Sequence, residues 1–381
     1  MRIRKLSVVA VSAILLAAGV TTTGAAPEPK EIYLVKWVDS VDFDNEIAAL
    51  KVGGGAINAD FRNLFKGAAV EMNAAQAAAL ARNPRIEFVE KDAIATTQLS
   101  QPIASGSGLW GLDRIDQKTL PLGSSYEYSS TGNGVNVYVV DTGIDVSLKS
   151  EFDNGVTFVK NYTKDRKNFD CNNHGTHVAG TIGSNTYGVA KNVRLFAYKT
   201  MDCKGSGPYS GIITALNDIA KNGVKPAVVN MSLGGPKSST LNTAVANLVS
   251  KGFVVVVAAG NENQNACNTS PGSALAALTI GSTTSTDARS SFSNFGSCLD
   301  LFAPGSAITS VLPGGTTASW DGTSMASPHV AGVAARILSQ NPSWSPAQVA
   351  TEISTTDATL NVVTSAGPES PNKLLFRAGT K

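Results

Sequence analysis

The chain has 381 residues, of which 43% are hydrophobic and 16% are charged, so it contains enough apolar material for a large core and lacks the composition of a disordered protein. Its 31 Lys and Arg residues nearly balance its 29 Asp and Glu residues, which argues against a protein that binds nucleic acid or an anionic membrane through net charge. The length is typical of two or three domains, and the four cysteines are too few for a small protein built on disulfides.

The N-terminal segment has the pattern of a secretory signal peptide. Arg2, Arg4 and Lys5 precede an apolar run at Val8–Val20, and small residues follow it. The run is shorter than the ~20 residues that a membrane-spanning helix needs, which disfavours the alternative of a retained anchor. We therefore expect residues 1–25 to be removed on export, leaving an extracellular protein without membrane contact.

A small α+β unit is predicted next. Residues 31–38 alternate apolar and polar side chains as a half-buried strand does, residues 74–81 form an Ala-rich helical pattern, and residues 85–90 read as a second strand. The following stretch, 95–108, is rich in Ser, Thr, Gln and Gly and has no periodicity. It is predicted to be a linker, the kind of segment where proteolytic cleavage concentrates.

From Trp110 onward, short apolar runs alternate with helical patterns. The predicted strands are 135–140, 193–198, 227–231, 254–259 and 277–280, and the predicted helices are 211–222, 239–251 and 324–339. Buried strands separated by helices indicate a parallel α/β sheet. Ligands bind beyond the carboxyl ends of such strands, so polar residues at strand ends are the first candidates for a site.

Three segments together offer the parts of a serine hydrolase. Asp141 ends an apolar strand, His174 precedes a helix of small residues, and Ser324 enters another such helix. Attack on a carbonyl by serine needs the hydroxyl, an imidazole that takes its proton, and a carboxylate that orients the imidazole. The chain order Asp, His, Ser is that of subtilisin-type enzymes and differs from that of chymotrypsin and the α/β-hydrolases.

The chain has three histidines, so a general base must be one of them. His174 and His177 are spaced to share a helix face, which is the alternative of a metal site, but no His-Glu-x-x-His pattern accompanies them. His177 and His329 lie in apolar helical stretches and are predicted to be buried structural residues.

Two further strand ends are candidates for substrate contacts. Asn261 follows a buried strand, where its amide could donate to a developing oxyanion, although an Asn in a turn is the alternative. Residues 230–235 end another strand with little side-chain bulk. Their backbone could pair with an extended peptide, as in recognition by strand addition.

The motifs DTG, HGTHVAG, NMSLGG, AAGN and GTSMASPHVAG, spread over residues 110–378 in that order, resemble those of subtilisin-like serine proteases, and within them the proteinase K-like and aqualysin-like branch. The resemblance implies a three-layer α/β fold with a mostly parallel central sheet, preceded by a small α+β ferredoxin-like prodomain. It also implies a secreted endopeptidase of broad specificity that prefers apolar or aromatic residues before the cleaved bond.

The resemblance implies roles for individual residues. Asp141, His174 and Ser324 match the catalytic triad that forms an acyl-enzyme, and Asn261 matches the oxyanion donor. The implied substrate-binding residues, on two strands and a pocket wall, are Ser232, Leu233, Gly234, Gly207, Tyr209, Ala258, Ala259 and Gly260.

The cysteines of an exported protein are expected to form disulfides, and four cysteines allow three pairings. A zinc site is disfavoured because no Cys-x-x-Cys spacing occurs. The resemblance implies the pairs Cys171–Cys203 and Cys267–Cys298.

Calcium is the one cofactor that the resemblance implies, in a structural role, with none needed for catalysis. Its site would use the carboxylate of Asp300 and the main-chain carbonyls of Leu275 and Ala277, which are the hard oxygen ligands that Ca²⁺ prefers. A second site matches some relatives near Asp113, Asp116 and Gln117, but Gly123 stands where certain relatives carry an acid.

The resemblance also assigns the domains. Residues 26–102 would be an inhibitor-type propeptide that assists folding and is removed autocatalytically, and residues 103–381 the peptidase. The expected partners are polypeptide substrates and the chain's own propeptide, and the mature enzyme is expected to be a monomer. The alternatives are a silent relative that only binds peptides and an esterase of different fold, which would hydrolyse small esters without cleaving peptides.

Overall fold

The computed structural model describes residues 29–97 and 109–377, and the chain divides into two compact units, Met1–Asp92 and Ala93–Lys381. The predicted signal peptide, residues 1–25, lies outside the described residues. The predicted border between propeptide and peptidase, at 102/103, lies outside them as well.

The first unit is a four-stranded antiparallel sheet with two helices. Its elements in chain order are β1 (Glu31–Trp37), α1 (Phe43–Val52), β2 (Ala56–Asp60), β3 (Gly67–Met72), α2 (Ala74–Leu80) and β4 (Ile86–Lys91). The sheet order β2-β3-β1-β4 gives the predicted ferredoxin-like arrangement. The three elements predicted from the sequence are confirmed as β1, α2 and β4, whereas α1, β2 and β3 were not predicted.

Local chemistry explains how these elements begin and pack. Asn73 and Gln76 form a reciprocal capping box that starts α2, because each side chain accepts the other residue's backbone N–H. The ring of Trp37 on β1 meets the ring of Phe43 on α1 edge to face, with centroids 5.4 Å apart. This contact fixes α1 against the buried face of the sheet.

The second unit contains the remaining elements. Its helices are α3 (Trp110–Ile115), α4 (His174–Gly183), α5 (Tyr209–Asn222), α6 (Ser239–Ser250), α7 (Thr323–Gln340) and α8 (Pro346–Thr355), with 3₁₀ turns at Ala266–Asn268 and Pro313–Gly315. Its strands are β5 (Ile94–Thr97), β6 (Asn136–Asp141), β7 (Val156–Asn161), β8 (Arg194–Lys199), β9 (Ser206–Pro208), β10 (Ala227–Met231), β11 (Leu233–Pro236), β12 (Val254–Ala258), β13 (Thr269–Ser270), β14 (Leu278–Thr283), β15 (Leu301–Pro304), β16 (Ile308–Val311), β17 (Thr317–Trp320), β18 (Ala358–Leu360) and β19 (Lys373–Leu375).

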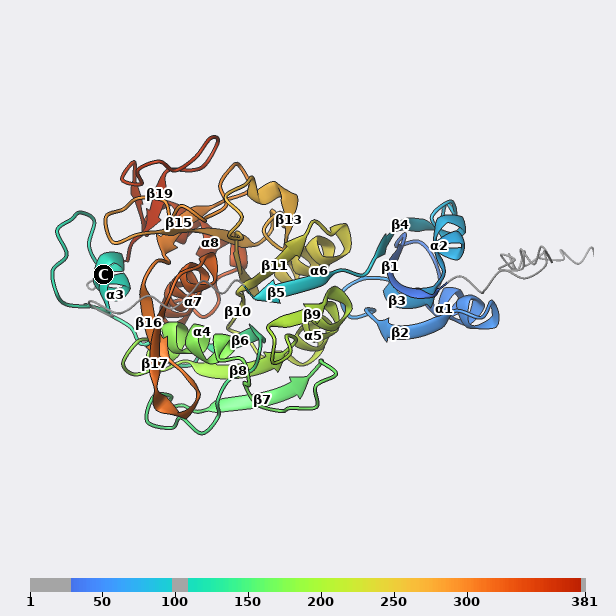
Figure 1. Ribbon diagram of the computed structural model, residues 1–381, viewed down its shortest axis with the longest axis horizontal. Helices are drawn as coiled ribbons and strands as arrows, with labels where there is room; N and C mark the ends of the chain where they lie inside the picture. The colour runs from blue at the N-terminus through green and yellow to red at the C-terminus, as the bar shows by residue number, and fades with distance from the viewer. Residues whose placement is uncertain (1–28, 98–108, 378–381) are drawn as a thin grey trace, which may run out of the picture. The chain divides into compact units, whose positions relative to one another are not determined.

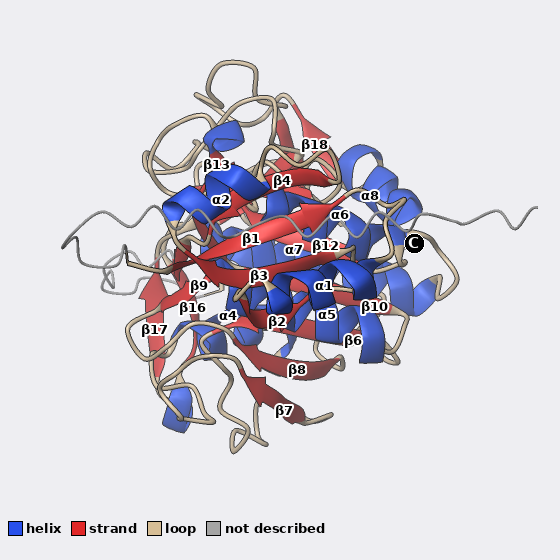
Figure 2. Ribbon diagram, turned by 90° about the vertical axis from the view of Figure 1, so that its right-hand side faces the viewer, coloured by secondary structure: helices blue, strands red, loops and turns tan. Residues whose placement is uncertain are grey.

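A nine-stranded sheet forms the middle of this unit, in the order β18-β19-β15-β14-β12-β10-β6-β8-β7, and part of that order is visible in Figure 2. Every neighbouring pair is parallel except β18 and β19. Helices α5 and α6 lie on one side of the sheet and α4 and α7 on the other (Figure 1). The predicted parallel α/β sheet is therefore confirmed, with three layers.

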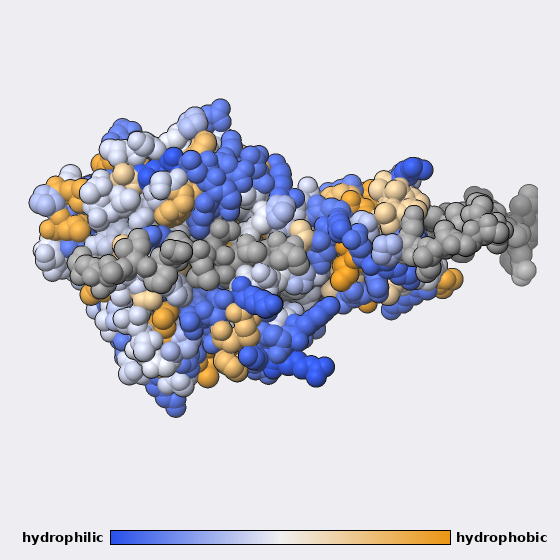
Figure 3. All heavy atoms as spheres, in the orientation of Figure 1, coloured by the Kyte–Doolittle hydropathy of each residue, from blue (hydrophilic) through white to orange (hydrophobic). Residues whose placement is uncertain are grey.

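The burial of the inner strands explains why apolar runs in the sequence predicted this sheet. All residues of β6, β10 and β12 are buried, as expected for strands covered by helices on both faces. On the face drawn in Figure 3, hydrophobic residues of this unit appear as small separated groups. Among the described residues, no helix combines the length and the apolar character that crossing a bilayer demands.

One prediction about the chain path was wrong. Residues 95–108 were predicted to be an irregular linker, but Ala95–Thr97 belong to strand β5, and residues 98–108 lie outside the described residues. β5 pairs with β9 on one side and with β11 on the other, both antiparallel, in a small sheet of order β13-β11-β5-β9. β5 forms because it pairs with two strands that are distant in the sequence. Its own residues therefore need not alternate between apolar and polar side chains, and the strand was not predicted.

Two disulfides join parts of the second unit. Cys171 is bonded to Cys203 and Cys267 to Cys298, the same pairs that the resemblance implied, and they close sequence separations of 32 and 31 residues. Cross-links of this span stabilise the fold chiefly by restricting the unfolded chain.

Replacing Cys267 and Cys298 by Ser should lower the free energy of unfolding by about 3–4 kcal/mol, because the loop of about 30 residues is then free in the unfolded chain. Guanidinium unfolding of the inhibited protein would measure the change. The Cys267→Ser single variant is the control, since it also breaks the bridge and should lose the same amount. A loss below about 1 kcal/mol in the double variant would contradict the stabilising role.

Candidate active site

Asp141 and His174 form a buried hydrogen bond at the carboxyl end of the parallel sheet. Asp141 is the last residue of β6, and its Oδ1 lies 2.7 Å from Nδ1 of His174, the first residue of α4. Both side chains are fully buried. An ionised carboxylate only accepts hydrogen bonds, so the pairing places the imidazole proton on Nδ1 and leaves Nε2 with a lone pair.

The hydroxyl of Ser324 has a different partner. Ser324 is in the first turn of α7, which packs against α4, and its Oγ donates to the main-chain carbonyl of Ser232 at 3.1 Å. Nε2 of His174 is buried and has no hydrogen-bond partner within the described ranges 29–97 and 109–377. The structure thus brings the two helices together, and proton transfer between the side chains requires the hydroxyl to leave Ser232.

Pro328 explains how the backbone of Ser324 is held. A proline has no N–H, so it cannot bond to the carbonyl four residues earlier, which is that of Ser324. That carbonyl accepts instead from Oγ of Ser232 at 2.9 Å, and the same Oγ contacts Oγ of Ser327 at 2.8 Å. The proline therefore ties the start of α7 to the segment before β11. Its spacing from Ser324 is visible in the sequence, but this consequence was not predicted.

Asn261 is oriented by the start of α7. Its Oδ1 accepts from the backbone N–H of Thr323 at 2.9 Å and from the Thr323 hydroxyl at 2.8 Å. Because the carbonyl end of the amide is fixed by these two donors, its NH₂ group faces the opposite way. The role of Thr323 was missed in the sequence, where it is only the residue before Ser324.

The other two histidines are buried away from this pair. Nε2 of His177 lies 3.1 Å from two main-chain carbonyls, and its ring stacks on Trp320 with centroids 4.5 Å apart. Burial, reinforced by the neighbouring His174, lowers the pKa of His177 to about 3. Burial also lowers the pKa of His329 to about 4.

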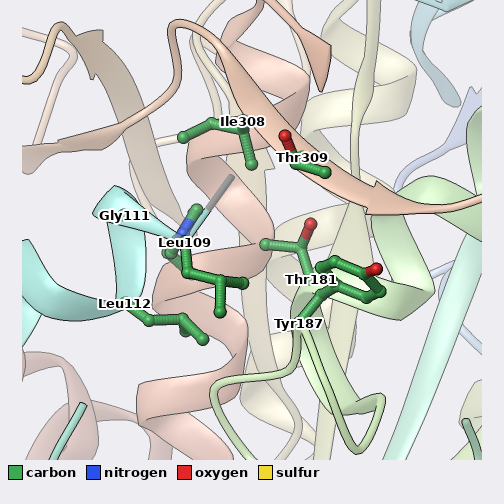
Figure 4. Close-up of a pocket in the computed structure, with 8 residues that line it drawn as sticks. Leu109, Gly111, Leu112, Thr181, Tyr187, Ile308 and Thr309 are labelled. Carbon is green, nitrogen blue, oxygen red and sulfur yellow. The ribbon is translucent and has the colours of Figure 1, made fainter. Parts of the chain in front are cut away.

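His329 lines a small pocket beside α3, drawn in Figure 4 with Leu109, Tyr187 and Ile308 among its other lining residues. Nδ1 of His329 lies 2.8 Å from the carbonyl of Met325, one turn earlier in α7. Both His177 and His329 are therefore neutral, structural residues.

The segments named as cleft walls flank a strand. β5 runs antiparallel between β9 and β11, with Ala95 opposite Gly207 and Thr96 opposite Gly234. Leu233 pairs with Thr97 in the same ladder. An extended segment of the chain is thus bound to both walls through its main chain.

Tyr209 contributes in a different way from the one expected. It begins α5, and its backbone N–H donates to the carbonyl of Ala93 at 2.7 Å. Its side chain is fully buried, and its hydroxyl donates to the carbonyl of Pro236 at 2.7 Å. The side chain thus braces the wall strand β11, and the backbone N–H bonds the residue directly before β5.

A pocket of about 280 Å³ opens next to β11. Its lining residues are Gly234, Gly235, Pro236, Gly260, Glu262, Gln264, Asn268 and Thr269. Of the three residues expected in its wall, Gly260 lines it, whereas Ala258 and Ala259 are buried and are not among the described lining residues. Glu262, Gln264 and Asn268 give this pocket a more polar lining than the sequence suggested.

The described residues hold one cluster of metal-ligating side chains by distance, Asp165 with Cys171 and Cys203, and its two sulfurs form a disulfide. At the expected second calcium site, the carboxylates of Asp113 and Asp116 accept hydrogen bonds from backbone N–H groups. Both carboxylate oxygens of Asp113 accept backbone N–H groups, and the N–H of Gly123 points at Asp113 and at Gln117.

Comparisons with known proteins agree with this geometry. Residues 132–379 match the family described as "Subtilase family", and residues 24–98 match "Peptidase inhibitor I9". The chain is 48% identical over 335 residues to "Extracellular serine proteinase" from Thermus sp. (strain Rt41A), covering 87% of this chain and 80% of that one. It is 43% identical over 312 residues to "Proteinase R" from Parengyodontium album, covering 80% and 79%.

A solved structure of a cold adapted subtilisin-like serine proteinase superposes on the chain with a TM-score of 0.67 and 46% identity. The match covers 71% of this chain and 98% of that one. The chain therefore belongs to the subtilase family, and it is a secreted serine proteinase that carries an inhibitor I9 segment ahead of its proteinase domain.

Proposed function

We propose that this proteinase is an endopeptidase whose catalytic triad is Asp141, His174 and Ser324. The observation that carries the proposal is the buried bond of 2.7 Å between Asp141 and Nδ1 of His174. It leaves Nε2 as the proton acceptor and supplies the negative charge that stabilises the imidazolium when it forms. The other two histidines support His174 as the base, because a ring nitrogen of each lies at hydrogen-bond distance from main-chain carbonyls and burial lowers the pKa of both.

The reaction would proceed by acyl transfer. Oγ of Ser324 attacks the peptide carbonyl as its proton moves to Nε2 of His174, and the carbonyl oxygen becomes an anion. The NH₂ group of Asn261 would donate to this oxyanion. Collapse of the intermediate expels the amine, which takes the proton from Nε2 and leaves an acyl-enzyme. Water then releases the acid by the same steps.

Substrate binding by strand addition is supported by β5. The main chain of Ile94–Thr97 pairs with both β9 and β11, which supports the proposal that an extended peptide binds between these strands in antiparallel register. Main-chain pairing is independent of side-chain type, so it accounts for broad specificity. An esterase would have no need of such a groove.

Selection of the residue before the cleaved bond would come from the pocket of about 280 Å³ lined by Gly234 and Gly260. Its glycine walls admit flat, large side chains, which supports the apolar and aromatic preference. Glu262 also lines it and is held by a hydrogen bond of 2.8 Å from the Asn294 amide.

The N-terminal region, residues 26–102 in our proposal, would act as an intramolecular inhibitor that the enzyme itself removes. The match to peptidase inhibitor I9 ends at residue 98, so β5 belongs to the inhibitor segment in sequence while it pairs within the second unit. A segment bound in the substrate groove both blocks it and presents itself for cleavage. Secretion would follow removal of residues 1–25.

Ser324→Ala should leave the secreted precursor unprocessed, because no nucleophile remains to cut the junction. Gel analysis and intact mass of the secreted product would show one species that retains the inhibitor segment. Ser339→Ala, in the last turn of α7, is the control and should mature normally, because its hydroxyl bonds the carbonyl of Arg336 and lies outside the hydrogen bonds around Ser324. Normal maturation of Ser324→Ala would contradict self-cleavage.

Asn261→Leu should reduce kcat by about 10²–10³-fold with KM little changed, the range expected when one donor to an oxyanion is removed. Steady-state hydrolysis of a peptide anilide by the mature variant would measure both constants. The companion variant Thr323→Ser keeps the hydroxyl that orients the amide and should keep most of the activity. An equal fall in both variants would mean that Asn261 acts only through packing.

We also propose one structural calcium site at Asp300. Its Oδ2 accepts from the backbone N–H of Thr279 at 2.8 Å, while Oδ1 has no hydrogen-bond partner among the described residues. Burial raises the pKa of Asp300 to about 6, partly offset by Lys373. An ionised carboxylate in such surroundings is unfavourable without a cation. The turn before β14 would add the carbonyls of Leu275 and Ala277, so the donors suit Ca²⁺.

Removing calcium with EDTA at pH 8 should lower the melting temperature of the wild type, whereas Asp300→Asn should lose its response to calcium. In EDTA the variant should be more stable than the wild type by roughly 2–3 kcal/mol, because a carboxyl with a raised folded-state pKa destabilises the protein once it is ionised. This difference should shrink as the pH falls through about 6. Calorimetry would follow both proteins.

Asp116→Asn serves as the matched control and should keep the full calcium response, since we do not propose a cation at the Asp113 loop. An unchanged melting temperature of the wild type in EDTA would rule out the structural role of calcium.

A further inference from the structure

We infer that Thr142 and Asp170 are positioning residues that lock Asp141 and His174 into register, an inference that rests on the proposed triad. Neither side chain touches the scissile bond in the proposed reaction. Together they join the turn after β6, which carries Asp141, to the first turn of α4, which carries His174.

One hydroxyl makes the central link. Oγ1 of Thr142 donates to Oδ1 of Asp170 at 2.9 Å and accepts from the backbone N–H of Gly175 at 2.8 Å. Thr142 directly follows Asp141 and Gly175 directly follows His174. The Thr142 hydroxyl therefore ties together the neighbours of the two residues whose side chains share a proton.

Asp170 anchors this link on the helix side. Its Oδ1 also accepts from the backbone N–H groups of Asn172 (3.0 Å) and Asn173 (2.9 Å). Its Oδ2 accepts from the backbone N–H of Thr176 at 2.8 Å and from the Thr176 hydroxyl at 2.6 Å. The carboxylate is buried, and both of its oxygens accept hydrogen bonds. It caps backbone N–H groups at the start of α4 that have no partner within the helix.

The same turn is held from the other side by Lys199. This buried ammonium donates to the carbonyls of Thr142 (2.8 Å) and Met201 (3.0 Å) and lies 3.3 Å from a carboxylate oxygen of Asp165. The backbone N–H of Thr142 donates to Oδ1 of Asp141 at 2.7 Å. The Thr142 peptide is thus fixed at its N–H, its carbonyl and its side chain.

Close packing leaves this turn little freedom. A Cβ added at Gly175 would lie 2.1 Å from the carbonyl oxygen of Gly143, so the turn and the helix meet backbone to backbone. Gly143 and Gly175 are the glycines of the DTG and HGTHVAG motifs. The contact explains why small movements of the turn would pass directly to His174.

The consequence concerns the rate of the chemical step. Misplacing a catalytic group by about 1 Å can lower the rate about 100-fold, even when the altered residue is away from the reacting atoms. None of Thr142, Asp170 and Lys199 is among the described residues that line the pocket or pair with β5. Loosening the link should therefore lower kcat and leave KM nearly unchanged.

The test compares Thr142→Val, which keeps the shape and removes the hydroxyl, with Thr142→Ser, which keeps the hydroxyl. Thr142→Val should lower kcat by about 10- to 100-fold at constant KM, and Thr142→Ser should restore most of it. Thr181→Val removes a different buried hydroxyl, one on α4 that bonds the His177 carbonyl within the described part of the chain, and should leave kcat unchanged.

A spectroscopic measurement separates positioning from general destabilisation. The far-downfield proton resonance of the His174–Asp141 hydrogen bond should shift or broaden in Thr142→Val and keep its wild-type position in Thr142→Ser and Thr181→Val. If Thr142→Val does not fold, Thr142→Ala provides the same comparison without a methyl group against the Asp170 carboxylate.

Two results would overturn the inference: equal losses of kcat in Thr142→Val and Thr142→Ser, or an unmoved resonance in a variant with lowered kcat. Failure of the proposed function itself would look different. In that case the wild type would neither cleave the peptide anilide nor react with a fluorophosphonate, whatever Thr142 is replaced by.

Discussion

The site depends on one buried electrostatic contact, the hydrogen bond between Asp141 and His174. Both side chains are removed from water, and only the fold keeps the carboxylate beside the imidazole. The parallel sheet places Asp141 at the end of β6, and α4 begins with His174 directly above it. Away from water such a hydrogen bond is strong. A small displacement of either side chain is costly, because no water molecule replaces the hydrogen-bond partner that is lost. The network around Thr142 and Asp170 follows from the same constraint.

The substrate groove that we propose depends on a second principle, that unpaired strand edges bind extended chains. β9 and β11 each present one edge, and β5 fills the gap between them with main-chain bonds. A groove of this kind binds the main chain of a peptide whatever its side chains are. Selection among side chains would then come from the pocket beside Gly234 and Gly260. Under our proposal the chain first uses the groove on its own inhibitor segment and later on substrates, so folding, inhibition and cleavage share one set of hydrogen bonds.

Features encoded locally could be predicted from the sequence, and features made by distant contacts could not. The inner strands were visible as apolar runs because helices cover both faces, and Asp141, His174 and Ser324 were visible because each lies where such a run or a small-residue helix begins or ends. The strand at Ala95–Thr97 escaped detection because two remote strands create it. The orientation of Asn261 by Thr323, the use of Pro328, and the polar lining given by Glu262 likewise arise only when separate segments meet. The alternative of a metal site at His174 and His177 is not supported, because one nitrogen of each ring already has a hydrogen-bond partner and neither histidine belongs to the cluster of metal-ligating side chains found by distance among the described residues.

The most direct test of the account is to treat the mature protein with a peptidyl fluorophosphonate and locate the adduct by mass spectrometry of its peptides. If Asp141, His174 and Ser324 act as one unit, the label will appear on Ser324 alone. His174→Ala, once its inhibitor segment has been cut off by added wild-type enzyme, will label more slowly by orders of magnitude at unchanged fold. Labelling of another residue, or labelling of Ser324 at the same rate in His174→Ala, would contradict the account.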